Sequence, residues 1–145
     1  MTKGRTILVA EHDRSISALI EEILLGEGYT MRRCASLPPT ICEIERAQPD
    51  GVIVDIGPGD ADTCMQLLQQ LRQSPALRNV GVLLSSTDSR LLNEISWPTA
   101  QMRCATLPKP FDLHEFISQL SYALDVAAGS TSEPQPPASA HYSLN

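Results

Sequence analysis

The sequence lacks the features that mark membrane-bound and nucleic-acid-binding proteins. No uninterrupted apolar run reaches the ~18 residues that a membrane span requires. The 11 lysines and arginines are outnumbered by 17 aspartates and glutamates, so the formal net charge is −6. Binding to nucleic acid or to anionic lipid requires a basic face. We therefore expect neither a nucleic-acid nor a membrane partner. Acidic residues begin at Glu11, so the N-terminus does not read as a secretory signal, and the expected location is the cytoplasm.

Cysteine is scarce, and its spacing indicates no metal site. None of the four cysteines forms a CxxC pair or lies beside histidine at a zinc-finger spacing. They are Cys34, Cys42, Cys64 and Cys104. We expect reduced thiols that are mostly buried.

The chain does contain enough apolar residues for one folded domain. It has 145 residues, of which 42% are apolar, and a chain of this size buries about 68–70% of its unfolded surface. From residue 129 onward the composition shifts to proline, serine and threonine, without lysine or arginine. Such a segment cannot bury enough apolar area to offset its ordering entropy. We expect a domain over residues 1–128 and a disordered tail over residues 129–145.

Apolar residues follow two alternating patterns along the domain. Short β-rich runs predict strands at 6–10, 29–31, 52–54, 80–84 and 102–107. Helical spacing predicts helices near 16–24, 36–47, 65–71, 91–95 and 113–124. The fourth helix is expected to stop at Trp97 and Pro98, with Trp97 in the core, and Asp112 is expected to cap the fifth. This alternation predicts a doubly wound, flavodoxin-like α/β fold with a parallel sheet.

Polar residues gather where the predicted strands end. Doubly wound sheets bind their ligands beyond the carboxyl ends of the strands. Here those ends carry acids, a histidine, hydroxyls and a lysine: Glu11-His12-Asp13, Asp55, Ser85-Ser86-Thr87 and Lys109. Taken alone, each is more typical of a helix cap or a solvated loop. Their joint occurrence in this order predicts a functional site.

Three segments resemble the receiver domain of two-component response regulators. They are residues 7–13 (ILVAEHD), 49–55 (PDGVIVD) and 107–111 (LPKPF), and the resemblance covers about residues 5–127. It implies a CheY-like five-stranded sheet in the order 2-1-3-4-5 with five helices. It also implies a phosphoacceptor signalling domain, not an enzyme. The partner would be a sensor histidine kinase or a phosphotransfer protein.

The resemblance assigns roles to residues at the strand ends. Asp55 would attack the phosphohistidine of the partner and become an acyl phosphate. Mg²⁺ neutralises charge at a phosphoryl group, and Glu11, Asp55 and the backbone carbonyl near Gly57 would hold it. His12 stands where the family has its second acid. A neutral imidazole is a poor ligand for Mg²⁺, so we expect weak binding at this position.

Two further side chains have implied roles after phosphorylation. Lys109 would pair with the phosphoryl oxygens, and a hydroxyl after the fourth strand would donate a hydrogen bond to them. Counting from Gly81, which stands at the family's usual proline position, selects Ser86. Ser85 and Thr87 remain alternatives, because the loop alignment is uncertain by one residue.

The sequence departs from the family at two other places. Pro58 follows Asp55 after three residues where the family has four, and Gly57 and Gly59 indicate a tight turn there. Thr106 replaces the aromatic residue that swings inward on activation. Two functions therefore remain open: a phosphoryl-accepting module, and a pseudo-receiver that acts through protein contact alone. Because no DNA-binding segment follows, the expected output is contact with a downstream protein, formation of a homodimer, or relay of the phosphoryl group onward.

Overall fold

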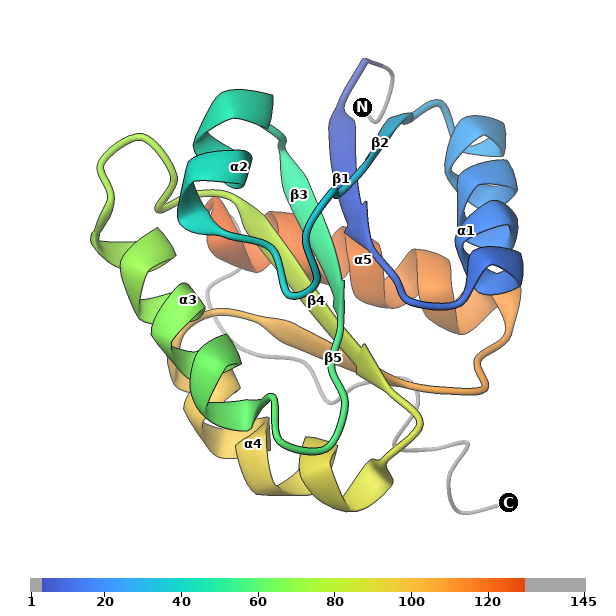
Figure 1. The fold of residues 1–145 in the computed structure, drawn as a ribbon. Coiled ribbons are helices and arrows are strands. Elements are labelled where there is room, and N and C mark those ends of the chain that lie inside the picture. The colour runs from blue at the N-terminus through green and yellow to red at the C-terminus, as the bar shows by residue number, and fades with distance from the viewer. Residues whose placement is uncertain (1–3, 130–145) are drawn as a thin grey trace.

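The computed structural model describes residues 4–129, which fold into a five-stranded parallel sheet with five helices (Figure 1). The strands are β1 (Thr6–Ala10), β2 (Thr30–Arg33), β3 (Gly51–Asp55), β4 (Gly81–Ser86) and β5 (Ala105–Pro108). The helices are α1 (Arg14–Gly26), α2 (Ile41–Ala47), α3 (Ala61–Gln73), α4 (Ser89–Gln101) and α5 (Leu113–Ala127). The strand order is β2-β1-β3-β4-β5, which confirms the predicted fold.

Two further sequence-based expectations concern the predicted tail and the lack of a membrane span. Except for Gly129, the predicted tail lies outside the described residues. Among residues 4–129, no helix combines the length and the apolar content that a bilayer span requires.

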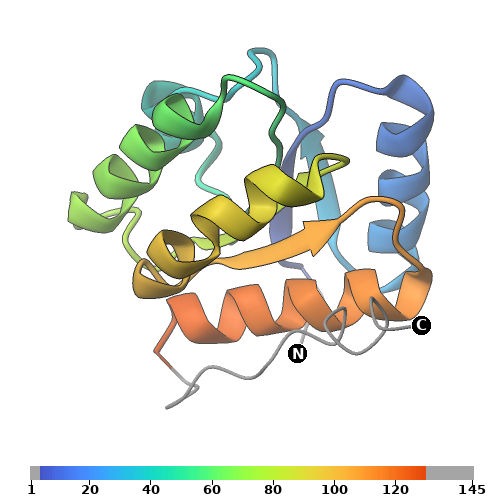
Figure 2. The same ribbon diagram turned by 90° about the horizontal axis from the view of Figure 1, so that it is seen from below.

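The helices cover the sheet in two layers. α1 and α5 lie on one face, and α2, α3 and α4 lie on the other (Figure 2). Successive side chains of a strand point to opposite faces, so Ile53 and Leu83 pack toward α1 and α5, whereas Val52 and Val82 pack toward the other helices. β3 and β4 run through the centre with both faces covered, and nearly all their residues are buried.

Side-chain caps set where four of the described helices begin. Asp13, Thr40, Asp88 and Asp112 each accept a hydrogen bond from a backbone amide in the first turn. With Glu115, Asp112 completes a capping box, so the predicted cap of α5 is confirmed. A cap of this kind contributes about 1 kcal/mol. Asp13 and Asp88 follow β1 and β4, so their caps also direct the loops at the carboxyl edge of the sheet.

Both predictions for the end of α4 are wrong. The helix continues through Pro98 to Gln101. Pro98 removes one helical hydrogen bond, but Ile95 and Thr99 on either side of it are buried, and the Thr99 hydroxyl donates to the Ile95 carbonyl at 2.8 Å. Packing of this face offsets the cost of the proline. Trp97 lies about 200° around the helix from Ile95 and is 72% exposed, not in the core.

Two element boundaries also differ from expectation. β5 begins at Ala105, three residues late, because Met102 caps α4 and Arg103 turns the chain with a φ of 59°. α2 begins at Ile41, after both prolines of segment 36–39.

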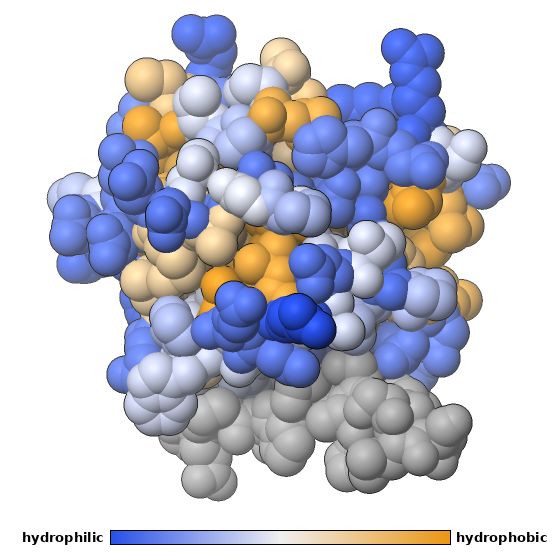
Figure 3. Space-filling view, turned by 60° about the horizontal axis from the view of Figure 1, so that its bottom comes forward, coloured by the Kyte–Doolittle hydropathy of each residue, from blue (hydrophilic) through white to orange (hydrophobic). Residues whose placement is uncertain are grey.

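Exposed apolar side chains are scattered over the surface. On the face shown in Figure 3 they form small separate groups among hydrophilic residues. The large apolar side chains with the most exposure come from α1, the loop before α2, α4 and α5: Leu19, Leu25, Leu37, Trp97 and Leu113.

Gly81 allows α5 to pack directly against β4. An added Cβ would lie 3.0 Å from the Leu124 Cα and 3.1 Å from the Ala123 carbonyl oxygen, and these backbone atoms move only if α5 shifts. We expect Gly81→Ala to lower the free energy of unfolding by about 2 kcal/mol in urea denaturation. Gly26→Ala is the matched control, because an added Cβ at Gly26 meets no atom within 4 Å. Equal stability of the two variants would contradict this prediction.

Candidate functional site

Strand alternation places two acids and a lysine at the carboxyl edge of the sheet. Val9 pairs with Ile53 and faces α1 and α5. Glu11 and Asp55 stand two residues further along each strand, and residues two apart lie on the same face. Lys109 follows β5 and reaches the same space. The structure thus brings together three of the predicted site residues.

Lys109 bridges the two carboxylates. Its Nζ lies 2.7 Å from Oε1 of Glu11 and 2.9 Å from Oδ1 of Asp55. The side chains of Lys109, Glu11 and Asp55 are 6%, 2% and 14% exposed. Two negative charges and one positive charge therefore share a mostly enclosed space, and Asp55 is the most accessible of the three.

These contacts keep Asp55 ionised. Burial raises the pKa of its carboxyl group, but the hydrogen bonds from His12 and Lys109 and the charge of Lys109 outweigh burial, so the pKa of Asp55 is lowered. Burial lowers the pKa of Lys109, but its bonds to Glu11 and Asp55 raise it overall. At neutral pH, Asp55 is a carboxylate, which is the form able to act as a nucleophile.

His12 contacts Asp55 at the carboxylate oxygen that Lys109 leaves free. The Nδ1 atom of His12 lies 2.8 Å from Oδ2 of Asp55, whereas Lys109 holds Oδ1. Sequence reasoning missed this contact, because nothing in the pattern shows where the His12 ring lies. The Asp13 carboxylate caps α1 instead, so it does not replace the missing second acid.

The loop after β3 forms a closed turn, as its glycines predict. The amide of Gly57 donates to Oδ2 of Asp60 at 2.9 Å, and the amide of Asp60 donates to the Gly57 carbonyl at 3.0 Å. Gly59 has a φ of 88°, which glycine adopts freely. The Gly57 carbonyl proposed as a metal ligand thus already accepts one hydrogen bond and keeps one lone pair.

The oxygen donors at this edge suit a hydrated divalent cation. Mg²⁺ typically binds one or two carboxylates and keeps several waters, and Glu11, Asp55 and the Gly57 carbonyl are donors of that kind. Among residues 4–129, no three His, Cys, Asp or Glu side chains are already arranged to hold a metal ion. The residues therefore fit Mg²⁺ with few protein ligands.

Comparison with known proteins tests the predicted fold. No family model matches the chain. The crystal structure of a putative response regulator from Chloroflexus aurantiacus J-10-fl aligns with a TM-score of 0.67 and 27% identity, and covers 84% of this chain and 98% of that one. In sequence and in fold, this chain is similar to response-regulator receiver domains.

The curated relatives of this chain are longer proteins, named DNA-binding transcriptional regulator NtrC. The one from Bradyrhizobium sp. (strain RP501 Parasponia) is 27% identical over 129 residues, which are 89% of this chain and 26% of the relative. The one from Rhizobium meliloti (strain 1021) is 29% identical over 121 residues, which are 83% of this chain and 24% of the relative. The chain spans about a quarter of their length.

One solved structure with the same fold contains a metal ion. The receiver domain of a sensor histidine kinase from Pseudomonas aeruginosa PAO1 has magnesium coordinated in its active-site cleft. It aligns with a TM-score of 0.64 and 21% identity, and covers 83% of this chain and 98% of that one.

The three candidate hydroxyls after β4 have different surroundings. Ser86 is buried at the end of β4, and its Oγ accepts a hydrogen bond from the Asp88 amide at 3.0 Å. Ser85 pairs with Asp55 in the sheet, and its buried Oγ has no hydrogen-bond partner among the described residues. Thr87 is exposed. Ser85 is therefore the hydroxyl on the same face of the sheet as Asp55.

The unpaired hydroxyl of Ser85 should reduce stability. A hydroxyl buried without a hydrogen bond costs about 1–3 kcal/mol, so we expect Ser85→Ala to raise the free energy of unfolding by about 1 kcal/mol in urea denaturation. Ser86→Ala is the control, because it deletes the acceptor of the Asp88 amide and should lower stability by about 1 kcal/mol. A loss of stability in both variants would show that Ser85 is satisfied.

A small apolar pocket lies beside the ion bridge. It has a volume of about 120 Å³ and is lined by Ile16, Leu19, Lys109, Pro110 and Phe111. The peptide bond between Lys109 and Pro110 is cis. The lining residues come from α1 and from the loop after β5, which are far apart in the sequence, so periodicity gave no signal for this pocket.

Proposed function

We propose that this chain is a receiver domain that accepts a phosphoryl group on Asp55 from the phosphohistidine of a sensor histidine kinase or phosphotransfer protein, in cytoplasmic two-component signalling. The observation that carries the proposal is the Glu11–Lys109–Asp55 bridge at the carboxyl edge of the sheet. In this bridge Asp55 is ionised, it is the most exposed of the three side chains, and a lysine lies directly beside it.

The transfer would proceed by attack of an Asp55 carboxylate oxygen on phosphorus. A P–O bond forms while the P–N bond to the donor histidine breaks, and the donor imidazole leaves. Lys109, 2.9 Å from Oδ1, stays within reach of the new phosphoryl oxygens and offsets their charge. Ser86, or in its place Ser85, would donate a hydroxyl hydrogen bond to the same oxygens.

Mg²⁺ is the proposed cofactor, with Glu11, Asp55 and the Gly57 carbonyl as its protein ligands. When bound, it would neutralise charge on the incoming phosphoryl group. The magnesium in the Pseudomonas receiver supports this proposal.

The partners of the domain are proposed to be proteins. The donor would dock beside Asp55, where the apolar pocket of α1 and the loop after β5 adjoins Lys109. The output would be contact with a downstream protein or with a second copy of the chain. The net charge of −6 disfavours nucleic acid as the partner of this region.

A second candidate function is a pseudo-receiver whose ion bridge is only structural. Two observations favour it. Protein groups already bond both oxygens of Asp55 and both oxygens of Glu11, and Thr106 offers no aromatic ring to swing inward. Such a domain would bind its partner equally well with or without a phosphoryl group.

Amide NMR spectra distinguish the two functions. We expect Mg²⁺ with beryllofluoride, a mimic of the acyl phosphate, to shift the amides of residues 11–13, 55–57, 85–87 and 109. The isosteric Asp55→Asn variant is the control, because it keeps the shape of the side chain and removes the nucleophile. The same spectra with and without beryllofluoride in the wild type would reject phosphoryl transfer and favour the pseudo-receiver.

A further inference from the structure

Protein groups already cap both carboxylate oxygens of Asp55. Lys109 Nζ lies 2.9 Å from Oδ1, and His12 Nδ1 lies 2.8 Å from Oδ2. The backbone amide of His12 also approaches Oδ2, at 3.5 Å. The oxygen that a cation would need is therefore occupied by the histidine ring.

The chemistry of this contact shows which group carries the hydrogen. An ionised carboxylate only accepts hydrogen bonds, and Lys109 keeps Asp55 ionised. The hydrogen of the 2.8 Å contact must therefore be on Nδ1 of His12. A nitrogen that carries a hydrogen has no lone pair to offer a metal ion, and in an imidazole ring the lone pair of Nε2 points away from the Nδ1 side. In this arrangement His12 is a donor to Asp55 and not a ligand.

The exposure of the side chains around Asp55 indicates which of its two contacts, with Lys109 or with His12, breaks more easily. The side chains of Lys109 and Glu11 are 6% and 2% exposed, whereas that of His12 is 53% exposed. Moving Lys109 would separate a buried ion bridge, which is costly. Moving His12 breaks one hydrogen bond at the surface, and water replaces it.

We propose that His12 competes with the divalent cation for Oδ2 of Asp55, so that its ring must leave before the cation binds. This inference rests on the proposed function, because it concerns a cation that enters the phosphoacceptor site. It makes His12 a residue that weakens cation binding, through a contact made only in the metal-free protein.

Direct measurement of Mn²⁺ binding tests the proposal. Like Mg²⁺, Mn²⁺ prefers oxygen ligands. Electron paramagnetic resonance measures the concentration of free Mn²⁺, so no activity assay is needed. We expect His12→Ala to bind Mn²⁺ about fivefold more tightly than the wild type, the factor expected for one hydrogen bond that no longer competes. His12→Asp should bind about tenfold more tightly again, because it adds a carboxylate ligand. Competition with Mg²⁺ should give the same ranking.

Two controls distinguish a specific effect of His12 on Mn²⁺ binding from a general effect of substitution or unfolding. His114→Ala, at an exposed position in the first turn of α5, should leave Mn²⁺ affinity unchanged. Circular dichroism melts should show that every variant is folded. Weaker binding by His12→Ala would identify His12 as a ligand, and unchanged binding would make it a bystander. Either result, or no binding by any variant, overturns the proposal.

The competition by His12 and the phosphoryl transfer to Asp55 can be rejected independently of each other. If His12→Ala binds Mn²⁺ more tightly but beryllofluoride leaves the spectra unchanged, the competition stands and phosphoryl transfer is rejected. If beryllofluoride shifts the spectra and His12→Ala leaves Mn²⁺ affinity unchanged, phosphoryl transfer stands and the competition is rejected.

Discussion

Replacing Lys109 with methionine is expected to lower the free energy of unfolding by about 3–5 kcal/mol at neutral pH. Methionine keeps the length and apolar stem of the side chain but removes the positive charge that Glu11 and Asp55 share. Glu11 is 2% exposed, so water cannot replace the lost partner. Because small domains are stable by about 5–15 kcal/mol in total, urea denaturation should detect this loss easily.

Two further variants distinguish the effect of removing a buried charge from the effect of removing any cationic side chain. Arg33→Met removes a pair with Glu21 whose side chains are 53% and 41% exposed, and it should cost less than about 1 kcal/mol. Glu11→Gln should restore part of the stability of Lys109→Met, because it removes one of the two facing negative charges. Equal losses in Lys109→Met and Arg33→Met would contradict the buried bridge.

The loss of unfolding free energy in Lys109→Met should depend on pH. In the wild type the pKa of Asp55 is lowered, so its contribution to stability is present above the ordinary carboxyl pKa of about 4 and is lost as the pH falls through the lowered value. In the variant, Lys109 no longer lowers the pKa of Asp55 and no longer offsets the repulsion between the two carboxylates, so acid relieves that repulsion. The difference in stability between the two proteins should therefore narrow as the pH falls below about 5.

The second large effect is expected at Arg72, in the last turn of α3. Its guanidinium donates to four backbone carbonyls, those of Met102 (2.7 Å), Val80 (2.8 Å), Arg78 (2.9 Å) and Arg103 (3.2 Å). These carbonyls belong to the loop before β4 and the turn between α4 and β5. Hydrogen bonds to charged groups contribute about 1.5–3 kcal/mol each, and their partners are left unpaired on deletion. We expect Arg72→Met to lower the free energy of unfolding by about 3–5 kcal/mol.

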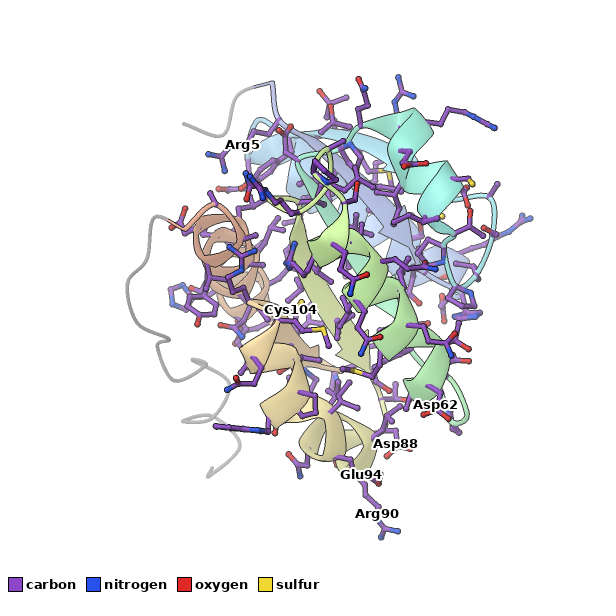
Figure 4. The ribbon with its side chains drawn as sticks, turned by 90° about the vertical axis from the view of Figure 1, so that its left-hand side faces the viewer. Arg5, Asp62, Asp88, Arg90, Glu94 and Cys104 are labelled. Atoms are coloured by element: carbon purple, nitrogen blue, oxygen red, sulfur yellow. The ribbon has the colours of Figure 1, made fainter. Side chains whose placement is uncertain are left out.

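The fork of the guanidinium, more than its charge, should account for this effect. Arg72→Lys keeps the charge but presents a single ammonium, which cannot reach four carbonyls in fixed directions, so it should recover less than half of the loss. Arg90→Met is the surface control, because Arg90 is exposed and projects away from α4 (Figure 4). That variant should stay within about 0.5 kcal/mol of the wild type. A cost below about 1 kcal/mol for Arg72→Met would contradict the prediction.

Sequence reasoning failed at the end of α4 for a definite reason. Proline is a reliable local signal against helix, and Trp97 reads as a core residue when only its size is considered. The structure overrides both signals, because Ile95 and Thr99 are buried by the sheet and hold the helix across Pro98. The same packing turns Trp97 to the opposite side of the helix, where it is exposed.

For the cysteines too, the sequence pattern did not show which side chains packing buries. The described structure contains four free cysteines. Cys64 and Cys104 are buried, and burial raises the pKa of these thiols to about 12 and about 11. Cys34 is half-buried and Cys42 is exposed, so the expected burial holds only for some of them.

The sequence by itself determined the fold and the location of the candidate site. Alternating strand and helix patterns require a parallel sheet, and the carboxyl ends of parallel strands share one edge, so Glu11, Asp55 and Lys109 had to lie near one another. Only the tertiary structure decided which groups bond to which. That His12 reaches Asp55 while Asp13 caps a helix, and that Arg72 holds two distant loops, depends on distances between residues far apart in the chain, and no local pattern encodes those distances.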